Sequence, residues 1–195
     1  MNLILIAKIV WGIGVLGWYA IRFPFERRVK RVKVVDKRDR LRERILLTCS
    51  TTGLGIIPGI WVFTGAPKFA DYPFTVVQLV LGTLVFGFSL WLFRRTHKDL
   101  GKNWSVTLEI KDTHKLITGG VYRHVRHPMY SAFFLWALAQ LILIPNLIAG
   151  PAGFIGFGIL FAFRVGREEA MMLDTFGEEY RAYSARTARI VPGVF

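Results

Sequence analysis

The sequence has a single cysteine, Cys49, and half as many acidic residues as basic ones. One cysteine excludes a framework of intramolecular disulfides. Thirteen Asp and Glu residues against 26 Lys and Arg residues leave a formal net charge of +13 over 195 residues. The sequence has no low-complexity stretch or internal repeat, and 53% hydrophobic residues exclude an intrinsically disordered chain. An apolar but strongly basic chain remains, which is typical of membrane proteins with basic cytoplasmic loops.

Five apolar stretches predict helices that cross a membrane, since a crossing needs about 20 apolar residues. They are residues 3–21, 45–64, 74–93, 130–144 and 147–165. The first contains Lys8, whose long side chain can reach the interface, and it is expected to be retained rather than cleaved as a signal peptide. Only Pro145 and Asn146 separate the last two, which predicts an antiparallel hairpin. The expected fold is all-α: one polytopic membrane domain over residues 1–195 with five transmembrane helices, a cytoplasmic connector and a C-terminal amphipathic helix.

The basic residues are concentrated in segments that five spans would place on one side. Residues 22–44 hold 11 basic and 4 acidic residues, residues 94–129 hold 8 and 3, and the tail 164–195 holds 5 of each. The positive-inside rule makes that side cytoplasmic, so we expect the N-terminus outside and the C-terminus inside, in the cell membrane of a prokaryote or the endoplasmic reticulum of a eukaryote. Because no aromatic residue lies between the charges of residues 27–44, contact with anionic lipid headgroups is favoured and no nucleic-acid partner is expected. Nothing in the pattern indicates an oligomeric state.

Three short patterns suggest functions that their context argues against. Residues 12–17 fit the dinucleotide-binding pattern G-x-G-x-x-G, but they lie inside an expected span, where close helix packing is favoured. Gly55 and Gly59 are likewise expected to form a packing face. His124 and His127 are three residues apart, yet no further His, Cys and carboxylate set completes a site, so no metal is expected.

A polar connector before the fourth apolar stretch carries many functional residue types. It reads H-K-L-I-T-G-G-V-Y-R-H-V-R-H-P-M-Y over residues 114–130. Gly119 and Gly120 permit a positive φ and a close approach of the backbone to a ligand. Pro128 suits the first turn of a helix, whose free N–H groups can bind an anion. On this pattern alone, Arg126 and His127 fit equally well as anchors of the helix at the headgroups.

A second charged block follows the fifth apolar stretch. Its members are Arg164, Arg167, Glu168 and Glu169. Charges at such a position are costly unless they are paired or functional. Arg164 and Glu168 are four residues apart and share one helix face. The alternative is an interfacial anchor followed by an amphipathic surface helix, which explains the tyrosines at positions 180 and 183 but explains the charge cluster less well.

Three motifs occur together in the second half of the chain. They are G-V-Y-R-x-x-R-H-P-x-Y at residues 120–130, the pair Glu168 and Glu169, and F-G-E-E-Y-x-x-Y at residues 176–183, with Pro192 near the end. With these motifs the chain resembles the isoprenylcysteine carboxyl methyltransferase family of integral membrane enzymes, from about residue 107 onward. Membrane phospholipid N-methyltransferases and the C-terminal part of membrane sterol reductases share the combination more loosely.

The resemblance implies a site for S-adenosylmethionine without a Rossmann domain, formed by the cytoplasmic connector and the last two helices. Carried over by motif, the cofactor-binding residues are His114, Lys115, Leu116, Ile117, Tyr122, His127, Pro128, Met129, Tyr130 and Glu168. The resemblance further implies that Glu168 lies opposite the cofactor's amino group and that Arg164 faces the substrate carboxylate. Arg164 and Glu168 are thus the expected catalytic residues.

The chemistry of the implied reaction agrees with these residue types. A C-terminal carboxylate has a pKa of about 3.5 and is ionised at neutral pH, so its methylation needs alignment and exclusion of water more than a base. Arginine provides a planar, permanently charged clamp for a carboxylate. The expected function is methylation of the C-terminal carboxylate of an isoprenylated cysteine, with the prenyl tail in lipid and S-adenosylmethionine arriving from the cytoplasm.

Three other functions remain open on the sequence. A phospholipid N-methyltransferase must deprotonate an amine, so its carboxylates would matter more than its arginine. A sterol or isoprenoid reductase would need NADPH, and the chain is short for that task. The third is a structural or partner-binding membrane protein without catalytic activity.

Overall fold

The structure, a computed structural model, describes residues 2–29, 40–101 and 116–194. Within them the order of elements is α1 (Leu3–Val29), α2 (Arg40–Thr51), η1 (Thr52–Ile56), α3 (Ile57–Thr64), η2 (Lys68–Ala70), α4 (Val76–Leu100), η4 (Gly120–Arg123), α5 (Pro128–Leu143), α6 (Ala152–Phe176) and α7 (Glu178–Arg186). In this part of the chain only isolated β-bridges occur beside the helices. The prediction of an all-α fold is confirmed.

Three helices in the described ranges are long and apolar enough to cross a membrane. They cover Leu3–Arg27, Leu41–Thr64 and Val76–Leu100. Helix α5 is apolar but has only 16 residues, and α6 has 25 residues but is charged in its C-terminal half. The expectation of five complete spans is therefore not confirmed.

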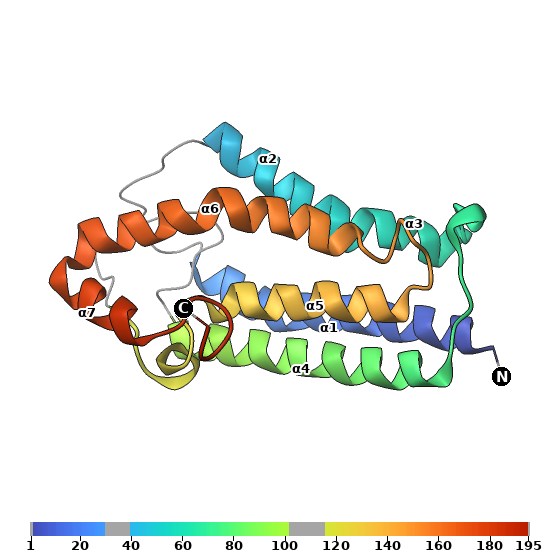
Figure 1. The fold of residues 1–195 in the computed structure, drawn as a ribbon, viewed down its shortest axis with the longest axis horizontal. Helices are drawn as coiled ribbons and strands as arrows, with labels where there is room; N and C mark the ends of the chain where they lie inside the picture. The colour runs from blue at the N-terminus through green and yellow to red at the C-terminus, as the bar shows by residue number, and fades with distance from the viewer. Residues whose placement is uncertain (1, 30–39, 102–115, 195) are drawn as a thin grey trace.

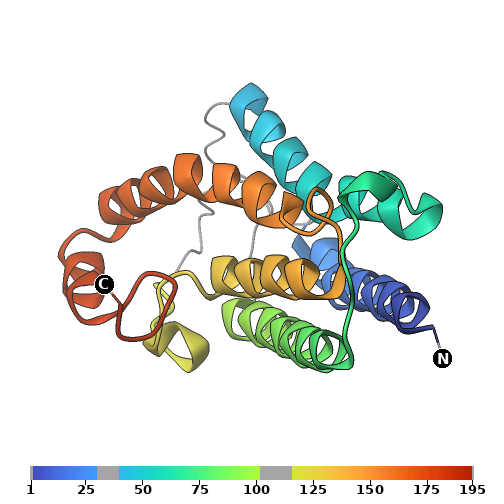
Figure 2. The same ribbon diagram turned by 45° about the vertical axis from the view of Figure 1, so that its right-hand side comes forward.

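The helices form two packed groups that run roughly along the long axis of the molecule. Helix α5 lies between α4 and α6 in both views, and α1 packs against α4 (Figures 1 and 2). Helix α2 and the π-helical segment η1 pack along α6. One end of the bundle holds the C-terminal part of α6, α7 and the C-terminus, and the other holds the N-terminus and α3 (Figure 1).

The helix ends follow local sequence signals. Thr75 and Gln78 form a capping box at the start of α4, in which each accepts a hydrogen bond from the backbone of the other. Helix α3 ends at Gly65, whose φ of 71° lies in the left-handed region that glycine adopts without strain. Pro128 occupies the first turn of α5, as its missing N–H predicts.

Glycines bring the helices into close contact. A Cβ atom on Gly14 would lie 2.1 Å from the Phe86 ring and one on Gly17 3.3 Å from Leu90, which confirms the expected packing role for these two glycines of residues 12–17 but not for Gly12, whose Cβ would have no described atom within 4 Å. The second expected packing face was wrong: among the described residues, a Cβ on Gly55 would have no atom within 4 Å, and one on Gly59 would have only Trp11, at 3.9 Å. The packing glycine is Gly53, where a Cβ would lie 2.2 Å from the backbone oxygen of Ala152 on α6. The π-turn at Thr52–Ile56 changes which residues face α6, and this cannot be deduced from a regular helical period.

The turn between α5 and α6 corrects the predicted boundary of the last apolar helix. A hairpin was expected and is found, but α6 begins at Ala152 rather than at residue 147. The side chain of Asn146 accepts hydrogen bonds from the backbone N–H groups of Ile148 and Ala149 and donates to Asp71. Because its amide satisfies these groups locally, the chain stays in a turn instead of starting the helix.

Candidate active site

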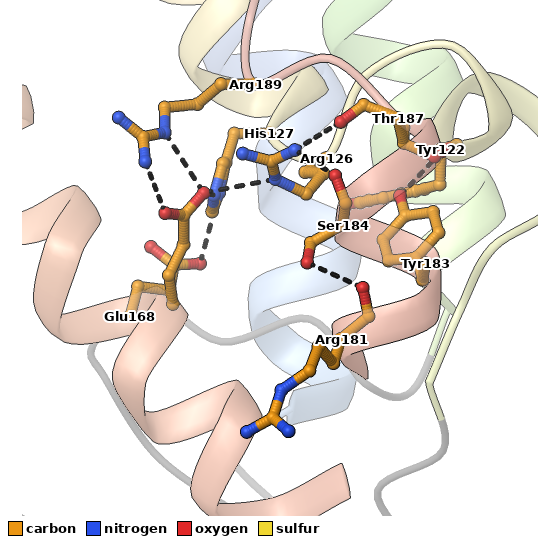
Figure 3. Close-up of polar contacts among 10 residues, drawn as sticks. Tyr122, Arg126, His127, Glu168, Arg181, Tyr183, Ser184, Thr187 and Arg189 are labelled. Atoms are coloured by element: carbon orange, nitrogen blue, oxygen red, sulfur yellow. Dashed lines mark hydrogen bonds and ion pairs between the residues drawn. The ribbon is translucent and has the colours of Figure 1, made fainter. Parts of the chain in front are cut away.

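The connector enters the site through a tight turn against the end of α4. Gly120 has a φ of 61°, and a Cβ on it would lie 2.2 Å from the carboxylate of Asp99. That carboxylate accepts a hydrogen bond of 2.9 Å from the backbone N–H of Val121. The turn buries Tyr122, whose backbone oxygen accepts a bond of 2.6 Å from the Tyr183 hydroxyl of α7 (Figure 3). The close backbone approach expected at Gly120 is thus found, with a carboxylate of the chain itself as the partner.

The segment after α7 returns to the connector and pairs with it. The backbone N–H groups of Arg126 and His127 donate to the backbone oxygens of Ala188 and Arg189 at 2.8 and 3.0 Å. The guanidinium of Arg126 also donates to the backbone oxygens of Ser184 and Thr187 (Figure 3). These bonds fix the conformation of the residues that lead into α5. Arg126 therefore has a defined structural partner rather than only an anchoring role at headgroups.

Glu169 is the centre of a charged network that joins α6, the connector and the C-terminal segment. Its carboxylate accepts a bond of 3.1 Å from Arg126 Nε and one of 2.7 Å from Arg189 Nη2, and its Oε1 lies 3.1 Å from His127 Nε2 (Figure 3). Burial acts to raise the pKa of Glu169, but the hydrogen bonds from His127 and Arg189 and the charge of Arg126 outweigh it and lower that pKa to about 2. Glu169 is therefore a firmly ionised structural carboxylate.

Glu168, the neighbouring residue, belongs to a different set of contacts. Its carboxylate accepts a bond of 2.5 Å from the Tyr130 hydroxyl on α5. His127 Nδ1 lies 4.0 Å from the other carboxylate oxygen, and the side chain of Glu168 is 31% exposed. Glu168 is therefore held by one tyrosine and keeps part of its carboxylate accessible to a ligand.

Arg164 lies one turn before Glu168 on α6 and interacts electrostatically with Glu168 and Tyr130. Its guanidinium forms an ion pair with Glu43 of α2, with 3.1 Å between Nη1 and Oε1. The side chains are only 11% and 10% exposed. A buried guanidinium flanked by two carboxylates is thus located where the apolar half of α6 ends.

Four of the expected site residues meet at this junction of α5, α6 and the connector. His127 and Tyr130 approach Glu168, and Arg164 lies beside them. Of the other expected residues, Tyr122 and Pro128 are buried, and Leu116, Ile117 and Met129 are half-buried. His114 and Lys115 lie outside the described residues.

Three residues of the candidate site were not predicted as site residues from the sequence. Glu43 was counted among the charges of a basic loop, although an acidic residue two positions before an apolar stretch was a usable signal. Glu169 was recognised only as half of a motif. The third is Tyr180 of α7, which is 6% exposed and whose hydroxyl has no hydrogen-bond partner among the described residues.

Comparison with known proteins identifies a family that matches the part of the chain containing this cluster. The sequence model of the isoprenylcysteine carboxyl methyltransferase (ICMT) family matches residues 74–174. The chain belongs to the isoprenylcysteine carboxyl methyltransferase family. The matched region contains α4, the connector, α5 and α6 up to Asp174, so it includes Arg164, Glu168 and Tyr130.

Named relatives support the same assignment. The chain is 34% identical over 130 residues to the probable protein-S-isoprenylcysteine O-methyltransferase of rice (Oryza sativa subsp. indica), which is 65% of each protein. It is 33% identical over 115 residues to the protein-S-isoprenylcysteine O-methyltransferase of Homo sapiens, 58% of this chain and 40% of the human protein. With the Dictyostelium discoideum enzyme the identity is 32% over 100 residues, 48% of this chain and 40% of that enzyme. The chain thus spans less than two thirds of the length of these relatives.

The fold agrees with a solved structure of the family. The eukaryotic intramembrane Ras methyltransferase ICMT superposes with a TM-score of 0.54 over 82% of this chain and 55% of that one, at 24% identity. With three apolar helices of sufficient length, this fold makes the ICMT homologue a multi-pass membrane protein.

Proposed function

We propose that this ICMT homologue is an S-adenosylmethionine-dependent methyltransferase that esterifies the C-terminal carboxylate of an isoprenylated cysteine. The observation that carries the proposal is the placement of Arg164 and Glu168. They lie on one face of α6, beside the Tyr130 hydroxyl, where the apolar part of the helix ends. Relatives named protein-S-isoprenylcysteine O-methyltransferases support the same acceptor.

The residues at the junction fit S-adenosylmethionine. Glu168 offers a partly exposed carboxylate to an ammonium group. The buried hydroxyl of Tyr180 has no hydrogen-bond partner in the described part of the chain, and a buried polar group of this kind calls for a ligand or water. His127, Tyr130 and the residues carried over from the connector would complete the binding site. When bound, the cofactor supplies an electrophilic methyl group on a sulfonium.

The side chains of the site bind and align rather than transfer protons. Arg164 binds the acceptor carboxylate, which is already ionised and needs no base. Tyr130 donates to Glu168 and holds that carboxylate in one orientation. The aromatic side chains of Tyr130, Phe157 and Phe161 pack together on the bundle side of the site and exclude water, which strengthens the contact between Arg164 and the acceptor.

The arrangement also supports an orientation in the membrane. The charged parts of α6, α7 and the connector lie at one end of the bundle (Figure 1). We infer that this end faces the cytoplasm, with the C-terminus inside and the N-terminus outside, as the excess of basic residues favours. The prenyl tail would enter from lipid, and the charged cofactor would arrive from water.

The test is methyl transfer in detergent or lipid nanodiscs from labelled S-adenosylmethionine to a farnesyl-cysteine analogue and, in parallel, to phosphatidylethanolamine. We expect ester formation on the farnesyl-cysteine only. Arg164→Ala should raise KM for the acceptor and lower kcat/KM about 10²- to 10³-fold, because a carboxylate clamp is lost. The matched control is Arg181→Ala, which removes an exposed arginine of α7 and should leave kcat/KM unchanged.

Each other function predicts a different result. Methylation of phosphatidylethanolamine alone would indicate an amine methyltransferase. Binding of NADPH without binding of S-adenosylhomocysteine would indicate a reductase. Absence of binding to any of these ligands would leave a structural membrane protein.

A further inference from the structure

The first turn of α2 is attached to α6 at the proposed substrate clamp. Two consecutive residues of α2 contact two consecutive residues of α6: Arg42 Nη2 donates to the Phe163 backbone oxygen at 3.2 Å, and Glu43 pairs with Arg164 at 3.1 Å. The register is fixed further along the helices, where a Cβ on Gly156 would lie 2.3 Å from the Cys49 backbone oxygen. Glu43 is thus held against Arg164 by helix packing and not only by its own charge.

The burial of this pair has an electrostatic consequence. Both side chains are about nine-tenths buried, and a buried carboxylate that loses its partner costs several kcal/mol. An acceptor carboxylate that displaced Glu43 would have to break this buried ion pair, so we expect it to bind Arg164 beside Glu43. Arginine has five N–H donors and can bind a second carboxylate along another edge. Glu43 and the acceptor would then share one guanidinium.

Sharing the guanidinium of Arg164 between two carboxylates weakens its binding of the acceptor. A guanidinium already partly neutralised by Glu43 withdraws less charge from the acceptor oxygen and binds it less tightly. A nucleophile that keeps its negative charge attacks faster, and weaker ground-state binding does not slow the chemical step. A carboxylate beside Arg164 is therefore useful for methylation even though it opposes acceptor binding.

We propose that Glu43 is the positioning residue for Arg164: it fixes one edge of the guanidinium and moderates its charge, so that the acceptor carboxylate is oriented without being held too tightly. The proposal deepens the methyltransferase function above and depends on it for its catalytic part. The claim that Glu43 weakens the binding of a carboxylate by Arg164 does not depend on methyl transfer, and it is measured separately.

The experiment compares two ligands that differ by one charge, farnesylthioacetic acid and its methyl ester, on the full chain with S-adenosylhomocysteine present. Glu43→Gln keeps the size and polarity of the side chain but removes its charge. We expect the acid to bind Glu43→Gln about tenfold more tightly than it binds the unmodified protein. The affinities of the ester for the two proteins should agree within about twofold. In turnover, both kcat and KM for the acceptor should fall, a pattern that indicates lost ground-state destabilisation.

Two further variants separate positioning from a structural role. Arg42→Ala removes the neighbouring contact between α2 and α6 without touching Arg164, and it should leave the ratio of acid to ester affinity unchanged. Glu43→Asp retracts the carboxylate by one methylene, and its ratio should lie between those of Glu43→Gln and the unmodified protein. If Glu43→Gln does not fold in detergent, the comparison of Glu43→Asp with Arg42→Ala carries the test.

The outcomes distinguish the two proposals. If neither Glu43 variant raises the ratio of acid to ester affinity, the positioning role is wrong, even where the unmodified protein methylates farnesyl-cysteine. If Arg42→Ala changes the ratio as much as the Glu43 variants, the effect is one of helix packing and the positioning role is again overturned. If the unmodified protein transfers no methyl group but the ratio responds to Glu43 alone, the charge coupling holds and the proposed reaction fails.

Discussion

Glu168 and Glu169 are adjacent in α6, yet they have separate tasks. Glu168 is held by Tyr130 and remains 31% exposed beside Arg164. Glu169 points to the connector and the C-terminal segment and accepts bonds from two arginines. Adjacent helical residues differ by about 100° in direction, so one pair of glutamates serves two neighbouring regions. The sequence motif alone does not tell which glutamate keeps an accessible carboxylate and which holds the fold.

This division predicts the effect of neutralising Glu169. Glu169→Gln leaves Arg126 and Arg189 beside an uncharged amide and should lower the free energy of unfolding by about 2–4 kcal/mol. Thermal unfolding in detergent measures the loss. The control is Glu178→Gln, whose pair with Arg181 is 81% and 64% exposed and should change stability by less than about 0.5 kcal/mol. Equal shifts for the two variants would contradict the structural role of Glu169.

At the scale of elements, α2 and α6 are held in register by small residues at η1. A Cβ on Gly53 or Gly156 would meet the backbone of the other helix. Gln140 of α5 supports the same place, because its Nε2 donates to the backbone oxygens of Gly53 and Ala149 at 3.1 and 2.8 Å. The π-helical segment η1 therefore packs against α6 and accepts a hydrogen bond from Gln140 of α5.

Gly156→Ala tests this contact. The added methyl group would lie 2.3 Å from the Cys49 oxygen and should push α2 away from α6, which lowers stability by about 1–3 kcal/mol and weakens the pairing of Glu43 with Arg164. Gly158→Ala is the matched control, because no atom in the described part of the chain lies within 4 Å of its Cβ position. Unfolding curves and methyl-transfer rates of the two variants give the measurement. Equal stability would show that the helices can separate at little cost.

The helices also show which features of the fold could be predicted from local sequence patterns. Apolar runs predicted where the helices lie, and the i,i+4 spacing predicted that Arg164 and Glu168 share a face of α6. The register of α2 on α6 was beyond prediction, because it is set by close contacts between residues far apart in the sequence, such as Gly156 against the backbone oxygen of Cys49, and these leave no periodic signal. Glu43 was missed for a related reason: its partner lies 121 positions later, and pairing over that separation depends on tertiary packing.

At the scale of the whole molecule, the charged end determines how stability depends on pH. The pKa of Glu169 is lowered from 4.5 to about 2, so the folded state binds its proton less readily than the unfolded state does. The stability that Glu169 contributes is complete above about pH 4.5 and is lost as the pH falls toward 2.

Acid unfolding of the intact protein checks this dependence. We expect the free energy of unfolding to fall more steeply between pH 4.5 and 2 in the unmodified protein than in Glu169→Gln, which lacks the titrating group. Stability curves in detergent at several pH values give the comparison. Parallel curves would mean that the carboxylate of Glu169 is not specially stabilised in the folded state.

The long separation between Glu43 and Arg164 also sets the order in which the protein matures. At about 5–20 residues per second, synthesis of the residues between them takes roughly 6–24 s. During that interval Glu43 of α2 has already been synthesised, while Arg164 of α6 does not yet exist. The pair of Glu43 and Arg164, the proposed substrate clamp, is therefore assembled only when the late helix arrives beside the early one, and an insertion intermediate that stops before α6 would contain Glu43 but not yet Arg164.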